Sequence, residues 1–281
     1  MPELPEVETI KRGLEKKIVG LTIKSVEVFT SKSFQGDKGK IIPKKIIGII
    51  RRAKILIIEF RDNYLLVHLK MTGQLIFRKF SMTNNQFSIK TKRYDVGELP
   101  NKYTRVIIEF NNKDKLYFND LRKFGWMKIV KNLDNLKLGP EPLEKEFTFE
   151  YFKKMLKKSR RPIKIIIMDQ QNLSGVGNIY ATEALFYAQI YPGKPANSLS
   201  DIEILRLRKS IIKVLKMGIA NLGSSSKDEA FRDIEGNKGS MQKHFAVYER
   251  EGLDCPGCKG KIKKIKLGGR GTYFCVNCQK Q

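Results

Sequence analysis

The first nine residues combine a potential nucleophile with potential acids. Pro2 follows the initiator methionine, and carboxylates follow at Glu3, Glu6 and Glu8. Because proline in second place usually permits removal of the methionine, Pro2 would carry a free secondary amine. An α-amino group has a reference pKa of about 7.7–8.0, so part of it is neutral near neutral pH and can attack an aldehyde-level carbon to form a Schiff base. The alternative is a terminus without fixed structure, leading into a helix with acidic residues near its positive end.

A second candidate for chemistry is a metal site near the carboxyl end. The four cysteines form two C-x2-C pairs separated by sixteen residues, at Cys255, Cys258, Cys275 and Cys278. Two such pairs can direct four thiolates at one tetrahedral ion. Two disulfides are an alternative, but intracellular proteins rarely keep them; redox-active pairs are another, but no βαβ pattern surrounds them. We predict one structural zinc ion and neither a catalytic metal nor an organic cofactor, because four cysteines leave no open coordination position.

Three further stretches place side chains where they could contact a ligand. Lys54 follows two arginines at the start of an apolar strand; it could hold a phosphate or transfer a proton, or it could be an exposed edge lysine. Met71 lies in a turn before Gly73 and could be either a wedge or part of the core. Arg122 and Phe124 share a turn, from which they could probe a duplex, since apolar side chains can enter base steps.

Glycines mark two possible anion sites. Gly175 and Gly177 precede Asn178 at the expected start of a helix, where unpaired N–H groups can bind an anion. The stretch is not a phosphate-binding Walker loop, because the Gly-Lys-Ser/Thr element is missing. Arg270 lies in a Gly-Gly-Arg-Gly stretch between the cysteine pairs, at the expected tip of a hairpin, and could pair bidentately with a phosphate.

The charge of the chain favours a polyanionic partner. Lysine and arginine number 55 against 29 acidic residues, a formal net charge of +26. Such an excess indicates nucleic acid first, although a lysine-biased proteome would also raise it. No apolar run approaches the roughly 18 residues of a membrane span, and the acidic amino end does not resemble a signal peptide. We therefore expect a soluble intracellular protein that does not associate with membranes.

The periodicity of apolar residues predicts an α+β fold. Apolar residues at three- and four-residue spacing predict a helix over 4–17, and β-branched runs separated by turns predict seven or eight strands between residues 21 and 130. Strands without intervening helices favour an antiparallel sandwich or barrel. Residues 79–101 are polar and are expected to form a long loop.

The carboxyl half changes to a helical period. We expect an N-terminal β-sandwich domain over 1–136, a proline-punctuated linker over 137–147, a helical domain over 148–249 and a basic zinc-finger hairpin over 250–281. Ser200 and Glu203 form a capping box for the longest predicted helix. Residues 223–244 are rich in Gly, Ser, Asp and Lys and are expected to form a long functional loop.

Taken together, these motifs resemble those of bacterial formamidopyrimidine-DNA glycosylases, the enzymes that remove oxidised purines such as 8-oxoguanine. The resemblance spans the whole chain and rests on seven stretches: residues 1–9, 51–54, 68–73, 120–125, 138–143, 175–180 and the finger with its Gly-Gly-Arg-Gly. The related endonuclease VIII branch usually has Glu-Gly-Pro where this chain has Glu3-Leu4-Pro5. That difference favours the oxidised-purine branch.

The resemblance implies a base-excision-repair enzyme with glycosylase and abasic-site lyase activities. Pro2 would attack C1′ of the flipped nucleotide, and protonated Glu3 would donate to the opening sugar ring. A β- and a δ-elimination would follow, for which the family assigns Lys54 and Arg270 as proton donors. We interpret the arginine as a phosphate-stabilising group, since arginine is effectively always charged in proteins. Glu6 would stabilise the local charge.

The resemblance also implies DNA contacts and a helix-two-turns-helix domain. The gap left by the flipped base would be filled by Met71, Arg122 and Phe124. The kinked backbone phosphates would be held by Lys54, His68, Arg160, Asn178 and Arg270. Loop 223–244 would close over the base. The partner would be double-stranded DNA with oxidised bases or abasic sites, bound by a monomer at the nucleoid of the bacterial cytoplasm.

Two positions depart from the family pattern. The family often has His-x-His where this chain has Tyr103-Thr104-Arg105, so Tyr103 would replace a DNA contact of the family. Leu121 stands where the family usually has proline. Two other functions remain open at this point. One is an endonuclease VIII-like enzyme for oxidised pyrimidines, and the other is a non-catalytic zinc-ribbon protein that binds damaged DNA.

Overall fold

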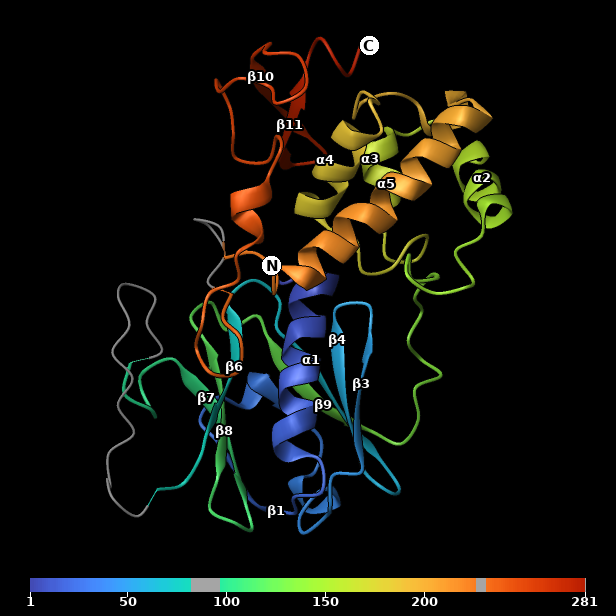
Figure 1. Cartoon of the computed structure of the whole chain (residues 1–281). Coiled ribbons are helices and arrows are strands. Elements are labelled where there is room, and N and C mark those ends of the chain that lie inside the picture. The colour runs from blue at the N-terminus through green and yellow to red at the C-terminus, as the bar shows by residue number, and fades with distance from the viewer. Residues whose placement is uncertain (82–96, 226–230, 281) are drawn as a thin grey trace. The chain divides into compact units, whose positions relative to one another are not determined.

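The chain folds into two compact units (Figure 1). The structure is a computed structural model that describes residues 1–81, 97–225 and 231–280. The first unit consists of Met1–Leu136 with Asn221–Gln242, and the second of Lys137–Ala220 with Lys243–Gln281. Most of the predicted loop 223–244 therefore groups with the first unit, although we expected it in the helical domain. The domain boundaries given above remain predictions, and residues 82–96 of the predicted polar loop lie outside the described residues.

Helix α1, Leu4–Ile18, begins at a capping box. Glu3 accepts from the backbone of Glu6, and the Glu6 side chain accepts from the backbone of Glu3, so two N–H groups at the helix start are satisfied. The predicted apolar face is buried, and α1 packs against strands β3, β4 and β6. The prediction of an ordered helix is confirmed, and the alternative of a terminus without fixed structure is wrong. The residues at the start of the chain are therefore held in place.

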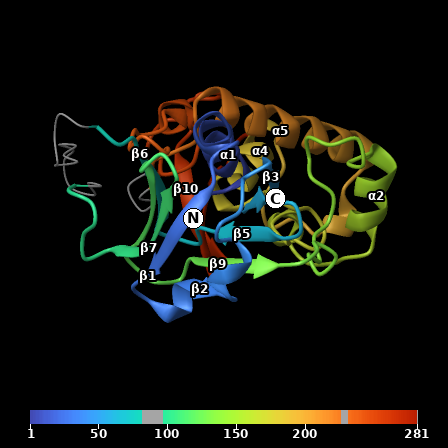
Figure 2. The same ribbon diagram turned by 90° about the horizontal axis from the view of Figure 1, so that it is seen from below.

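Two sheets form the body of the first unit (Figure 2). The four-stranded sheet has the order β1-β7-β8-β6 and the five-stranded sheet the order β2-β9-β5-β4-β3. The first comprises β1 Ile23–Val28, β6 Gly73–Arg78, β7 Thr104–Phe110 and β8 Lys115–Asp120; the second comprises β2 Phe34–Gln35, β3 Gly48–Arg52, β4 Ile55–Glu59, β5 Tyr64–His68 and β9 Trp126–Val130. All pairs are antiparallel except β2 with β9. The predicted antiparallel sandwich is confirmed.

The sequence-based strand assignment needs two corrections. β2 was missed because it has only two residues, and 3-10 turns at Ser31–Ser33 and Lys38–Lys40 flank it. Arg51 and Arg52 were expected between strands, but they form the end of β3 and pair with Leu56 and Ile55 of β4. The cross-strand pairing continues through these arginines, so only Ala53 and Lys54 remain in the turn.

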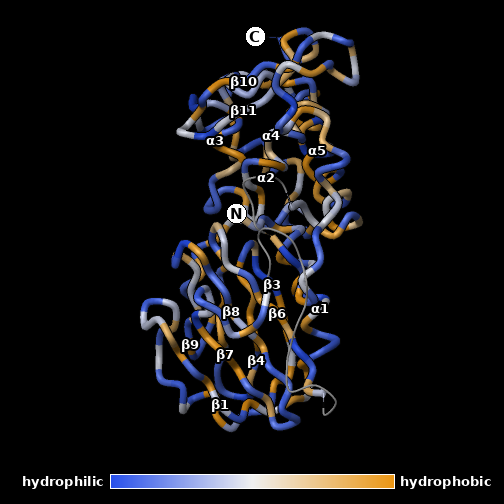
Figure 3. Tube along the Cα trace, turned by 90° about the vertical axis from the view of Figure 1, so that its left-hand side faces the viewer, coloured by the Kyte–Doolittle hydropathy of each residue, from blue (hydrophilic) through white to orange (hydrophobic). Residues whose placement is uncertain are grey.

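The core of the first unit includes side chains from the distant segment Asn221–Gln242. Hydrophobic residues recur along the strands of both sheets (Figure 3) and bury a common cluster with the apolar face of α1. Phe231 and Ile234 belong to the same cluster. The Phe77 N–H donates to the Ile234 carbonyl at 2.8 Å. Burial of these two side chains explains why the segment groups with the first unit.

The second unit contains four α-helices and a hairpin among its described residues. They are α2 Phe149–Lys157, α3 Ile163–Ile167, α4 Asn178–Tyr187, α5 Asp201–Ala220, and the hairpin strands β10 Ile262–Leu267 and β11 Arg270–Cys275. The predicted capping box is present, because Ser200 N–H donates to Glu203 Oε2 at 2.8 Å. Helix α3 is shorter than expected. The Gln170 amide donates to the carbonyls of Met168 and Val176, which stabilises a turn instead of a further helical turn.

A buried carboxylate joins α4 to the segment before the hairpin. Glu183 is fully buried and accepts from the backbone N–H groups of Ala246, Val247 and Tyr248 at 2.9, 3.0 and 2.8 Å. Three converging N–H groups offset part of the desolvation of the carboxylate, although burial still raises the pKa of Glu183 above its ordinary value. The contact attaches residues 246–248 to the helical part of the unit.

Replacement of Glu183 by alanine should therefore destabilise the second unit. Glu183→Ala leaves three buried N–H groups without an acceptor, which should lower the free energy of unfolding by about 3 kcal/mol. The measurement is urea unfolding followed by circular dichroism at 222 nm. The exposed Glu146 provides the control, since Glu146→Ala should change the free energy by less than about 0.5 kcal/mol. Equal stability of the two variants would contradict the structural role of Glu183.

Candidate functional site

The amino end carries a buried pair of carboxylates. Pro2 is buried, and Glu3 and Glu6 are 2% and 0% exposed. Glu6 Oε2 accepts from Glu3 N–H at 2.8 Å, and Glu6 Oε1 accepts from Ser224 N–H at 2.7 Å. Gly223 passes so close that a Cβ there would lie 2.8 Å from Glu6 Cγ, and its φ is +78°. Glu6 thus binds the peptide beside Pro2 to the first residues of the predicted loop.

Lys54 occupies the turn between β3 and β4 and is 5% exposed. The interpretation of an exposed edge lysine is therefore wrong. Ala53 has a left-handed φ of 55°, and its carbonyl accepts from Arg51 Nη1 at 3.0 Å. Arg51 Nε also donates to Glu8 Oε2 at 2.9 Å, which connects the turn to α1. These contacts fix a buried ammonium in the same unit as the amino end.

His68 ends β5 and stays neutral at ordinary pH. Ile55, beside Lys54, pairs with His68 across β4 and β5. Burial, with the positive charges of Lys70 and Lys54, lowers the pKa of His68 from 6.5 to about 3. Its Nδ1 accepts from Lys70 N–H at 3.0 Å, so the proton of the neutral ring is on Nε2. His68 can therefore donate a hydrogen bond to an anion without carrying a charge.

The predicted gap-filling residues lie on two loops of the first unit. Met71 is partly exposed, Arg122 is exposed, and the Phe124 side chain is 54% exposed. The Arg122 guanidinium lies 4.8 Å from the centre of the Phe124 ring, within the range of a cation–π contact. Leu121 is 48% exposed on the same loop. Leu121 and Phe124 thus expose apolar surface to solvent, which is unfavourable unless a partner covers it.

Tyr103 lies close to this loop through its backbone. Its carbonyl accepts from Asp120 N–H at 2.9 Å, its N–H donates to Asn101 Oδ1 at 2.9 Å, and the Lys102 ammonium lies 5.2 Å from its ring. The ring is partly exposed. The role of Tyr103 as a DNA contact stays a prediction.

In the second unit, a buried lysine that the motifs did not reveal organises the predicted anion site. Lys164 is fully buried, and its Nζ donates to Asn178 Oδ1 and Thr272 Oγ1, both at 2.7 Å. Asn178 Nδ2 donates to Gly271 O at 3.2 Å. The start of α4 and the hairpin tip are thus joined next to exposed Arg270. The sequence feature that could have indicated its burial is the position of this single lysine within the apolar stretch Ile163–Ile167.

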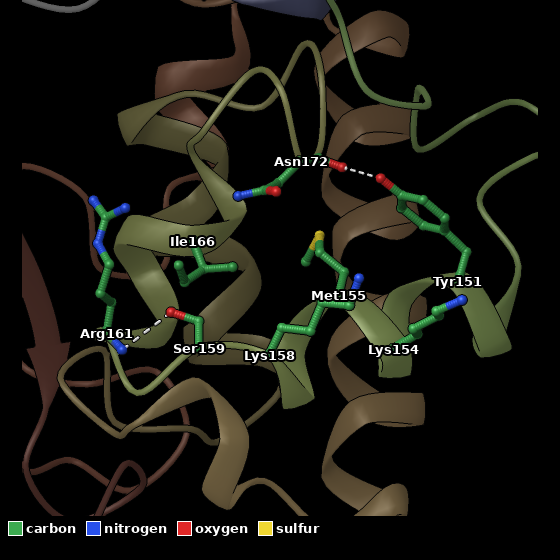
Figure 4. A pocket seen from close by; sticks show the side chains of 8 residues that line it. All are labelled: Tyr151, Lys154, Met155, Lys158, Ser159, Arg161, Ile166 and Asn172. Carbon is green, nitrogen blue, oxygen red and sulfur yellow. Dashed lines mark hydrogen bonds between the residues drawn. The ribbon is translucent and has the colours of Figure 1, made fainter.

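A cationic cavity lies elsewhere in the second unit (Figure 4). It has a volume of about 510 Å³ and is lined by Lys154, Lys158 and Arg161, with Met155 among its apolar residues. Its lining contains no carboxylate and no predicted catalytic residue. Arg160, the predicted phosphate contact, is exposed beside Arg161 in the chain. This part of the unit adds positive charge without adding a group for catalysis.

The four cysteines fit a zinc ion. Their thiols are free, and all four sulfur atoms lie within 4.8 Å of one another. The Sγ atoms are 3.8 Å apart in Cys255–Cys278 and 3.4 Å apart in Cys258–Cys275. A tetrahedral ion with Zn–S bonds of about 2.3 Å requires sulfur atoms about 3.8 Å apart. The donor set is therefore suited to structural zinc, and the alternative of two disulfides is wrong.

Comparison with known proteins identifies relatives over the whole chain. Three family models match: the formamidopyrimidine-DNA glycosylase N-terminal domain over residues 1–127, the H2TH domain of the same proteins over 138–230, and a zinc finger found in FPG and IleRS over 252–281. The formamidopyrimidine-DNA glycosylase of Pelotomaculum thermopropionicum is 42% identical, covering 100% of this chain and 99% of that protein.

Solved structures show the same architecture. The MutM (Fpg) protein of Thermus thermophilus matches with a TM-score of 0.87 and 36% identity, covering 100% of this chain and 99% of that one. A Lactococcus lactis FPG mutant, solved with DNA containing Fapy-dG, matches with a TM-score of 0.86 and 35% identity over 100% of both chains.

In residues 1–81, 97–225 and 231–280, no helix has the length and apolarity that a bilayer span needs.

The neutrality of His68 can be tested by titration. Since the pKa of the folded state, about 3, lies below the ordinary value of 6.5, the unfolded chain takes up the proton first as the pH falls. The stability contributed by neutral His68 is complete above pH 6.5 and decreases toward pH 3. We expect the His68 ring nitrogens to keep constant NMR shifts between pH 8 and 5, with His244→Gln used for assignment. A midpoint near 6.5 would contradict this result.

The zinc site predicts a local response to metal removal. Purified protein should contain about one zinc ion per chain, and Cys258→Ser should release it and loosen β10 and β11, because zinc-binding energy contributes to folding. Trp126, the single tryptophan, lies in the first unit and should keep its emission maximum. Elemental analysis and limited proteolysis provide the measurements. An intact hairpin after verified zinc loss would contradict a structural role of the metal.

Proposed function

Because the chain belongs to the formamidopyrimidine-DNA glycosylase family, we propose that its oxidised-purine excision proceeds through a Schiff base at Pro2. The protein is a DNA glycosylase of base excision repair, and its partner is DNA containing lesions or abasic sites. The observation that carries the proposal for Pro2 is its buried position beside two buried carboxylates. We expect it to act as a monomer in the bacterial cytoplasm, at the nucleoid.

In the first step, the Pro2 nitrogen attacks C1′ of the flipped nucleotide. This step requires removal of Met1, since an amide nitrogen at Pro2 has no available lone pair. The glycosidic bond breaks, and the base leaves with its electron pair and takes up the proton that the Pro2 nitrogen releases. Glu3 donates a proton to the ring oxygen as the sugar opens, and the nitrogen–carbon bond becomes the iminium. Glu6 supports this step, because its contact with Glu3 N–H fixes the peptide that joins the nucleophile to the acid.

The eliminations use the polarity of the iminium. It acidifies the C2′ proton, whose loss expels the 3′-phosphate, and a second elimination expels the 5′-phosphate. Buried Lys54 carries ammonium protons and serves as the proton donor of the first elimination. Arg270 stabilises phosphate charge through its guanidinium N–H groups and does not transfer a proton, because arginine is effectively always charged in proteins. The structural zinc holds the hairpin that carries Arg270.

DNA is held by contacts from each unit. The phosphate contacts that we propose are His68 and Tyr103 in the first unit and Arg160, Asn178 and Arg270 in the second. Neutral His68 would donate from Nε2, and Asn178 would act with the N–H groups at the start of α4. Met71, Arg122 and Phe124 would occupy the gap left by the flipped nucleotide.

Borohydride trapping tests the chemistry directly. A duplex with one 8-oxoguanine opposite cytosine is incubated with the protein and borohydride, and the cross-linked peptide is mapped by mass spectrometry. We expect the adduct on Pro2, with Met1 absent. An adduct formed only with thymine glycol would indicate the endonuclease VIII-like function instead. DNA binding without any adduct would indicate a non-catalytic binder.

Variants of Glu3 separate the two activities. Glu3→Gln should lower excision of 8-oxoguanine by about 100-fold or more, the usual contribution of a general acid. It should still form the adduct with a preformed abasic site, whose sugar already opens to an aldehyde. The control Glu15→Gln removes an exposed carboxylate from the same helix and should leave both activities unchanged. Equal loss of both activities in Glu3→Gln would contradict its role as the acid.

A further inference from the structure

The proposed gap-filling residues lie on two loops that are attached to adjacent ends of two paired strands. The Met71 loop (residues 69–73) leads into β6, and the Phe124 loop (residues 121–125) follows β8. Gly73, the first residue of β6, pairs with Asp120, the last residue of β8. The antiparallel pairing of β6 and β8 therefore places the two loops side by side.

One buried side chain contacts both loops. Asp120 is 0% exposed. Its Oδ1 accepts from Thr72 Oγ1 at 2.5 Å and from Arg122 N–H at 3.1 Å, while its Oδ2 accepts from Gly125 N–H at 2.7 Å. The carboxylate thus binds the Phe124 loop near both ends and the Met71 loop at Thr72. Hydrogen bonds to a buried carboxylate are stronger than those between neutral groups.

Thr72 completes the connection between the loops. Its Oγ1 donates to Asp120 and also accepts from Arg122 N–H at 3.0 Å. Thr72 follows Met71 directly, so the hydroxyl joins the residue beside the methionine to the backbone of the arginine. The three groups form a closed set of hydrogen bonds, in which a shift of one loop requires a shift of the other.

The backbone of both loops is restricted in the same way. Gly73 N–H donates to Leu69 O at 2.9 Å, and a Cβ at Gly73 would collide with that carbonyl oxygen. A Cβ at Gly125 would lie 2.7 Å from Phe118 Cζ. Lys123 has a left-handed φ of 57°. The Phe124 loop is thus a tight turn around the Asp120 carboxylate, and its shape does not depend on a proline at Leu121.

We propose that Asp120 and Thr72 join the Met71 loop and the Phe124 loop into a single rigid probe, so that the three gap-filling side chains enter the duplex together. Asp120 and Thr72 are positioning residues, because neither is required to touch DNA. The inference rests on the proposed gap-filling role of Met71, Arg122 and Phe124. A rigid arrangement favours binding, because side chains that are already ordered lose less conformational entropy when they insert into the duplex.

Thr72→Val tests the connection between the two loops, because valine keeps the shape of the threonine side chain and removes its hydroxyl. Asp120 variants are less suitable, because they leave several N–H groups without an acceptor and put folding at risk. Thr72→Val should lower single-turnover excision from an 8-oxoguanine:cytosine duplex by about tenfold. Borohydride trapping on an abasic site in single-stranded DNA, where no gap in a duplex is filled, should change by less than about twofold. Thr72→Ser, which keeps the hydroxyl, should restore duplex excision. The control Thr148→Val removes a hydroxyl that caps α2 and should leave both readouts unchanged.

A double-mutant cycle measures the coupling itself. With Thr72 present, the effects of Met71→Ala and Phe124→Ala on duplex excision should be non-additive by about threefold or more; in the Thr72→Val background they should multiply independently. Equal non-additivity in both backgrounds, or an equal loss of duplex and single-strand activity in Thr72→Val, would overturn the proposal. If the unmodified protein forms no adduct with either substrate, the proposed function fails instead.

Discussion

The buried carboxylate of Glu6 is the contact on which the geometry of the amino end depends. It accepts one hydrogen bond from Glu3 and another from Ser224, residues separated by most of the chain. An ionised carboxylate without these donors would be costly to bury, so the contact forms only when α1 and the segment after α5 are both in place. The proposed nucleophile and acid are therefore positioned by long-range tertiary structure and not by the helix alone.

The basic residues of the proposed sites differ in charge state and in burial. His68 is kept neutral by burial and by two neighbouring lysines, and Lys54 and Lys164 are buried cations with different surroundings. Lys164 is bound to uncharged oxygen atoms of Asn178 and Thr272 and acts as a structural connector. Arg122, Arg160 and Arg270 are exposed. Exposed arginines suit contacts with phosphate, whereas buried cations suit positioning and proton transfer.

Local patterns predicted much of the fold. The apolar period of α1, the β-branched runs of the sheets, the capping box at Ser200 and the spacing of the cysteines each depend on neighbours in the sequence. The motifs also identified the residues proposed for chemistry, and the family to which the chain belongs. They did not reveal the burial of Lys54, since a hairpin turn is normally exposed.

The missing information concerns contacts between distant residues. The connection of Lys164 with Asn178 and Thr272, and that of Thr72 with Asp120, join side chains whose separation in the sequence follows no period. Asp120 looked like an ordinary turn residue beside Arg122 and Phe124. Only the pairing of β6 with β8 shows that its carboxylate lies under a second loop. Similarly, composition identified 223–244 as a loop without showing that Phe231 and Ile234 belong to the first unit's core.

The position of Phe231 and Ile234 has a consequence for biosynthesis. The first 136 residues emerge from the ribosome well before these two side chains, and all of Lys137–Ala220 is translated in between. Since domains tend to fold in the order of their synthesis, the nascent sandwich must wait with an incomplete core and with Glu6 lacking its Ser224 donor. The amino end of the polypeptide acquires its final environment only after the helices of the second unit have been translated.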